Sequence, residues 1–109
     1  MRQSHTAIVE RDVIWTGAFE TEPYEASWAR EAIFFVRTLE ASEGVTEARV
    51  QISPDGIRWC DEGTTVSLCK EKDGVAFGKV NHFGTFLRLV GELPEGAEMR
   101  VIVYLSLKE

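Results

Sequence analysis

A tight chain reversal at Pro54-Asp55-Gly56 constrains the fold of this chain more than any other segment. Before it, residues 48–53 alternate apolar and polar side chains, which is the period of a half-buried β-strand. Proline presets φ, aspartate bonds its own backbone and glycine tolerates a positive φ, so these three residues favour a turn. Ile57 and Trp59 resume the alternation. The segment predicts a β-hairpin that carries Ile57 and Trp59 into the core of a sheet.

The remainder of the chain repeats this pattern of short strands and turns. Apolar segments recur at intervals of about 8–12 residues, the spacing typical of sandwiches and barrels, and no long segment has the helical period. We therefore predict an all-β fold with a single domain over residues 1–109. The fold is an antiparallel β-sandwich of about eight strands, jelly-roll-like. Its core is expected to contain Val50, Ile52, Ile57, Trp59, Val66, Leu68, Leu87, Leu89, Val101, Val103 and Leu105.

Composition excludes several classes of function. The 109 residues, 44% of them hydrophobic, suffice to bury a core without metals or disulfides. The net charge is −6 and the 12 basic residues are scattered singly, which argues against nucleic acid as a partner. No segment is apolar enough for a signal peptide or a membrane span, so we expect no membrane partner. The expected location is the cytoplasm or a virion or virus-like particle.

Few side chains are suited to chemistry. Nucleophilic catalysis needs a base near the nucleophile, yet the chain has only His5 and His82, and His82 falls in a predicted turn. No metal-binding spacing is present, and Cys60 and Cys69 are expected to be reduced thiols, although spacing alone leaves a disulfide open. We expect neither enzyme activity nor a metal or cofactor.

Two predicted strands are apolar on both faces. In residues 99–107 the odd-numbered positions form an apolar stripe, and Ile102 and Tyr104 lie on the opposite face. In residues 32–41, Ile33, Phe35 and Leu39 oppose Phe34 and Val36. A two-layer sandwich needs one apolar face per strand, so the second face requires a cover. Either residues 10–27 or a second subunit supplies it, and the candidate interface residues are Phe34, Val36, Ile102 and Tyr104.

Aromatic side chains near a polar loop support an alternative from another class. Trp15, Tyr24 and Trp28 flank or lie in the acidic segment 20–27, where exposed rings could stack on sugars. This alternative is a carbohydrate-binding module, with a glycan as partner.

Two segments carry a family resemblance. Residues 50–59 (Val-Gln-Ile-Ser-Pro-Asp-Gly-Ile-Arg-Trp) and 83–91 (Phe-Gly-Thr-Phe-Leu-Arg-Leu-Val-Gly) resemble a hairpin and an Arg-bearing strand of small β-sandwich phage structural proteins, of the capsid-decoration or head-associated kind. The resemblance spans about residues 32–107. It implies a non-enzymatic structural or assembly protein that forms a homo-oligomer, with a trimer favoured over a dimer, and that contacts a capsid-like shell protein. The same segments are more weakly similar to discoidin-type carbohydrate-binding domains.

Overall fold

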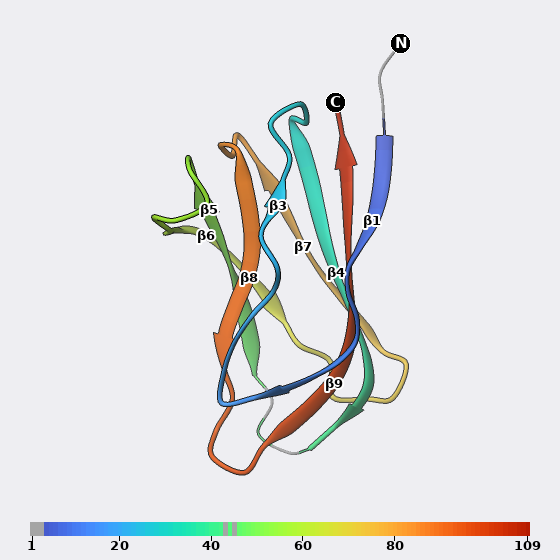
Figure 1. The fold of residues 1–109 in the computed structure, drawn as a ribbon. Helices are drawn as coiled ribbons and strands as arrows, with labels where there is room; N and C mark the ends of the chain where they lie inside the picture. The colour runs from blue at the N-terminus through green and yellow to red at the C-terminus, as the bar shows by residue number, and fades with distance from the viewer. Residues whose placement is uncertain (1–3, 43, 45) are drawn as a thin grey trace.

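The computed structural model describes residues 4–42, 44 and 46–109, and these residues form nine β-strands (Figure 1). All strand pairs are antiparallel, which confirms the predicted all-β sandwich. The strands are β1 (Ser4–Thr16), β2 (Ala18–Glu20), β3 (Tyr24–Glu25), β4 (Glu31–Ala41), β5 (Glu47–Ser53), β6 (Cys60–Ser67), β7 (Val75–Asn81), β8 (Phe86–Glu92) and β9 (Glu98–Lys108).

Two sheets pack face to face (Figure 1). The first has the strand order β1-β9-β4-β7, and the second has the order β2-β8-β5-β6, with the short β3 also paired to β8. We call them the first sheet and the second sheet. The chain passes repeatedly from one sheet to the other, so each sheet combines strands from distant parts of the sequence. The core lies between the two layers.

The chain changes sheets at Gly17, between β1 and β2. Gly17 has a φ of +55°, a backbone conformation that glycine adopts without the strain of a side chain. Its carbonyl accepts a hydrogen bond of 2.8 Å from the N–H of Leu93. Across this corner the rings of Trp15 and Phe19 stack with their centroids 4.0 Å apart, and both are buried. The corner therefore places two large aromatic rings in the core.

Most of the predicted core is confirmed. Eight of its members are buried, and Ile52 is partly buried against the same cluster; the eight are Val50, Val66, Leu68, Leu87, Leu89, Val101, Val103 and Leu105. Met99 and Leu107 complete the apolar stripe of β9. This stripe runs through the centre of the first sheet because β9 pairs with β1 on one side and β4 on the other.

The assignment of Ile57 and Trp59 to the core is wrong. Ile57 is 76% exposed, and Trp59 is only partly buried, on the outer side of the second sheet against Arg88. The reversal is not a two-residue turn. Residues 54–59 form a longer loop, and β6 begins only at Cys60. Because of these extra residues, the alternation of inward and outward side chains in β5 does not continue in phase across the loop.

The assignment of Phe34 and Val36 to an interface is also wrong. Both side chains are fully buried, and their partners on β9 are Leu105 and Val103, which belong to the core. The outward face of β4 instead carries Phe35, together with Ile33, Arg37 and Leu39. Both faces of β4 are apolar, so the alternation alone does not reveal which face turns inward.

Candidate interaction surfaces

The outer face of the first sheet carries an apolar row that crosses all four strands. Ile8 of β1 lies opposite Tyr104 of β9, Tyr104 lies opposite Phe35 of β4, and Phe35 lies opposite Phe77 of β7. Ile8 is 42% exposed and Phe77 is 57% exposed, while Phe35 and Tyr104 between them are partly buried. The rings of Phe35 and Phe77 have centroids 6.3 Å apart, within the range of interacting aromatic pairs. We call these four residues the apolar row.

More apolar and some charged side chains border the apolar row. On the next level of the sheet, Ile102 and Val75 flank Arg37, whose guanidinium is 3.0 Å from the Asp73 carboxylate. The hydrogen bond that Arg37 donates to Asp73 is the largest cause of a raised pKa for Arg37, and Tyr104 adds to it. Ile102 and Tyr104 therefore lie on an exposed apolar face, as expected, although Phe34 and Val36 do not.

Residues 10–27 do not cover this face. Their two largest buried side chains, Trp15 and Phe19, enter the core between the sheets, and their strands β2 and β3 pair with β8 of the second sheet. Phe77 and Val75 stay more than half exposed. Of the two covers that the sequence left open, the segment within the same chain is therefore excluded.

The outer face of the second sheet has the opposite character. Arg88 of β8 donates to Gln51 of β5 at 2.8 and 2.9 Å and to Glu20 of β2 at 2.8 Å. Gln51 in turn donates to Asp61 of β6 at 2.9 Å, and Arg49 donates to the same carboxylate at 3.2 Å. The hydrogen bond from Gln51 is the largest cause of a lowered pKa for Asp61, and the bond from Arg49 adds to it. The polar groups thus satisfy one another in a ladder across four strands.

Trp59 belongs to this ladder rather than to the core. The Arg88 guanidinium lies 4.1 Å from the centroid of the Trp59 ring, a cation–π arrangement. The Arg88 side chain is only 16% exposed because the indole covers it on one side and the sheet covers it on the other. The tryptophan of the hairpin therefore closes a polar network, a role that its neighbours in the sequence do not indicate.

The three aromatic side chains proposed to stack on sugars differ in how exposed they are. Trp15 is 4% exposed and stacked on Phe19, so it is not available to a sugar, and its selection was wrong. Tyr24 is partly buried and packs against the core. Trp28 is 38% exposed on the turn between β3 and β4.

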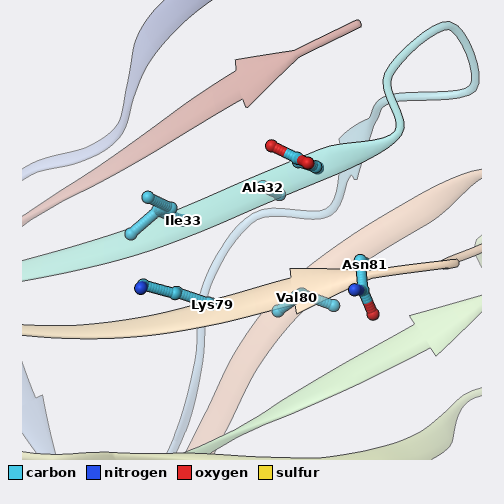
Figure 2. Close-up of a pocket in the computed structure, with 6 residues that line it drawn as sticks. Ala32, Ile33, Lys79, Val80 and Asn81 are labelled. Carbon is cyan, nitrogen blue, oxygen red and sulfur yellow. The ribbon is translucent and has the colours of Figure 1, made fainter.

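Two shallow hollows lie at the end of the first sheet near Trp28. One, of about 540 Å³, is lined by Trp28, Arg30, Glu31 and Glu109. The other, of about 390 Å³, is lined by Glu31, Ala32, Ile33, Lys79, Val80 and Asn81. Figure 2 shows Ile33 of β4 beside Lys79 of β7, with Asn81 further along the same strand.

The remaining candidate groups are dispersed. His82 has a φ of +53° in the turn after β7, in agreement with its expected place in a turn. Cys60 is an exposed free thiol and Cys69 a partly buried one. Within residues 4–42, 44 and 46–109, no three His, Cys, Asp or Glu side chains are grouped so as to hold a metal ion. The same part of the chain contains no helix long and apolar enough to cross a bilayer.

Comparison with known proteins gives a likeness of fold. No protein-family model matches the chain, and no curated protein matches its sequence. Among solved structures, the chain is similar to the SPBc2 prophage-derived protein YomS, with a TM-score of 0.64 over 100% of this chain and 96% of that one. The two sequences are 11% identical, so the likeness concerns the fold.

Proposed function

We propose that this protein is a non-enzymatic structural or assembly protein of a phage or phage-like particle, and that it forms a homo-oligomer through the outer face of its first sheet. Its location would be the virion, or the cytoplasm before assembly. The apolar row of Ile8, Tyr104, Phe35 and Phe77 is the observation that carries this proposal. Aromatic residues are enriched at the centres of protein interfaces, and large exposed apolar patches mark such interfaces.

The contrast between the two outer faces supports the choice of surface. On the second sheet, Arg88, Gln51 and Asp61 bond to one another and keep that face compatible with water. On the first sheet, Phe77 and Ile8 are exposed at opposite ends of one row. A second copy that packs on the first sheet would remove the apolar row from water, at a gain of about 25 cal/mol per Å² of apolar area.

The strand order supports the finer proposal of a jelly roll. Each sheet has four main strands, and the orders β1-β9-β4-β7 and β2-β8-β5-β6 combine as two Greek keys do. Jelly rolls are used for viral capsid and lectin domains. The likeness in fold to a prophage-derived protein agrees with a phage role, and a capsid-like shell protein is the proposed second partner.

The oligomeric state tests this proposal. Sedimentation velocity of the full chain at micromolar concentration should show a species heavier than the 12.3 kDa monomer, and three times that mass is expected for the trimer. Phe77→Asp should shift the protein to the monomer, because it places an unpaired charge in a desolvated contact. Phe77 is 57% exposed, so the variant should still fold, and far-UV circular dichroism verifies this.

Ile57→Asp is the matched control. Ile57 is also a highly exposed apolar residue, but it lies on the loop between β5 and β6, away from the first sheet. This variant should keep the oligomer. A wild-type protein that sediments as a 12.3 kDa monomer, or a Phe77→Asp variant that assembles as the wild type does, would overturn the proposed interface.

A further inference from the structure

We infer that the end of the first sheet around Trp28 is a binding site for a neutral carbohydrate. The hollows of about 540 and about 390 Å³ are neighbours, because Glu31 lines both of them. We call the two hollows together the Trp28 groove; the residues that line them include Trp28, Arg30, Glu31, Lys79, Asn81 and Glu109. This site does not depend on the proposed self-association.

Trp28 is presented by a turn that is anchored at both ends. The N–H of Ala26 donates to the carbonyl of Thr85 at 2.8 Å, just before β8 of the second sheet. The N–H of Arg30 donates to the carbonyl of Lys108 at 2.9 Å, in β9 of the first sheet. The indole is thus held at 38% exposure on a fixed backbone, so little conformational entropy would be lost when a ring packs on it.

Four polar side chains of the Trp28 groove are available to hydrogen-bond with a ligand. Within the described residues, the side chains of Arg30, Glu31, Lys79 and Asn81 make no ion pair and no hydrogen bond to another residue. Glu31 and Asn81 lie directly opposite each other on β4 and β7. They offer a carboxylate and an amide on neighbouring strands. Arg30, on the adjoining turn, lines the larger hollow together with Glu31. The ladder on the second sheet, whose polar groups are already paired, offers nothing equivalent.

The charges and the aromatic ring of the Trp28 groove indicate which class of ligand it would bind. Arg30 and Lys79 are balanced by Glu31 and Glu109, so the groove has no excess of positive charge for a phosphate or a nucleic acid. A sugar ring combines an apolar C–H face, which packs on an indole, with hydroxyl groups that both donate and accept hydrogen bonds. The groove has room for more than one ring.

Calorimetric titration of the full chain with defined oligosaccharides tests this inference. The probes are the neutral hexasaccharides of cellulose, chitin, xylan and starch, with a heparin hexasaccharide as the acidic comparison. At least one neutral probe should bind saturably with a Kd of about 1 mM or lower, and heparin should not bind. Trp28→Ala should weaken that binding at least about tenfold. Trp28→Phe, which keeps a ring, should weaken it less, and Asn81→Ala should weaken it about threefold or more.

Phe77→Ala is the control, because it removes an exposed ring of the same sheet outside the Trp28 groove. Its affinity for the sugar should equal that of the wild type. Far-UV circular dichroism verifies that each variant is folded. If Trp28→Ala does not fold, the affinities of Asn81→Ala and Trp28→Phe for the sugar test the inference instead. The inference is overturned if no neutral probe binds with a Kd of about 1 mM or lower, if heparin alone binds, or if these variants leave the affinity unchanged. The monomeric Phe77→Asp protein should still bind sugar, which separates this result from the test of assembly.

Discussion

At the scale of single residues, Asp55 organises the loop between β5 and β6. Its Oδ1 accepts hydrogen bonds of 2.9 Å from the N–H groups of both Arg58 and Ile57, and its Oδ2 lies 2.9 Å from the Arg58 guanidinium. Ser53 Oγ caps the N–H of Gly56 at 2.8 Å. The backbone bond from Arg58, followed by that from Ile57, lowers the pKa of Asp55 from 3.8 to about 2. The ionised carboxylate is therefore the form that builds this loop.

The lowered pKa of Asp55 predicts a loss of stability in acid. The folded-state pKa is below the unfolded value, so the stabilisation is complete above about pH 3.8 and is lost as the pH falls through about 2. Carbon-detected NMR titration should find a midpoint for Asp55 near 2. The stability difference between the wild type and Asp55→Ala should shrink over the same interval. A midpoint at 3.8 would show that these bonds do not form in solution.

Phe34 and Phe35 are neighbours with opposite environments, and they give a direct test of the orientation of β4. Phe34 is fully buried, so Phe34→Ala should reduce the free energy of unfolding by about 3–5 kcal/mol. Phe35 is partly exposed on the outer face, so Phe35→Ala should cost clearly less in the monomer. Urea unfolding of both variants at low protein concentration makes the comparison. Equal losses of unfolding free energy, or a larger loss for Phe35→Ala, would contradict the assignment of Phe34 to the buried face of β4.

At the scale of elements, the short β2 depends on a glycine in its partner strand. Phe19 of β2 is the register partner of Gly91 of β8. A Cβ atom on Gly91 would come within 2.5 Å of the Phe19 ring and 3.1 Å of the Glu47 carbonyl. The absent side chain thus leaves the space in which Phe19 stacks on Trp15.

Gly91→Ala should therefore displace Phe19 and reduce the free energy of unfolding by about 1–3 kcal/mol, as overpacking does. Gly84→Ala is the matched control, because its Cβ would meet nothing closer than the Ser53 carbonyl at 3.7 Å. Thermal unfolding of the two variants makes the comparison. A Gly91→Ala protein as stable as Gly84→Ala would mean that Phe19 does not occupy this position.

The two edge strands of the first sheet, β1 and β7, differ in the regularity of their pairing. Strand β1 changes register between Ile8 and Glu10 and again between Glu10 and Val13, and Asp12 there has a φ of +54°. Irregularities of this kind protect an edge from pairing with another chain. Strand β7 pairs with β4 in a continuous register. Beside it, the Thr64 hydroxyl of β6 donates to the Lys79 carbonyl of β7 at 3.3 Å. The apolar row therefore ends at Phe77 on the more regular of the two edges.

At the scale of the whole molecule, net charge and apolar surface oppose each other. Each copy carries a charge of −6, so copies that approach one another are repelled, whereas burial of the apolar row attracts them. Salt screens the repulsion and leaves the apolar attraction intact. Raising the NaCl concentration from about 0.02 M to about 0.5 M should therefore shift sedimentation towards the oligomer. Dissociation by salt would indicate an interface held by ion pairs, and Phe77→Asp should stay monomeric at both concentrations.

The fold class, most of the core and the surplus apolar faces are all predictable from the order of the residues. These features follow from local alternation and turn chemistry, as in β9, where every odd position from Met99 to Leu107 is buried. The inward face of β4 is not predictable in this way, because Phe34 and Phe35 are equally apolar and the choice between them depends on pairing with β9. Nor is the place of Trp59 predictable, since the length of the loop after Pro54 resets the alternation. The Trp28 groove joins Trp28 to Asn81, more than fifty positions away, so only the strand order brings them together.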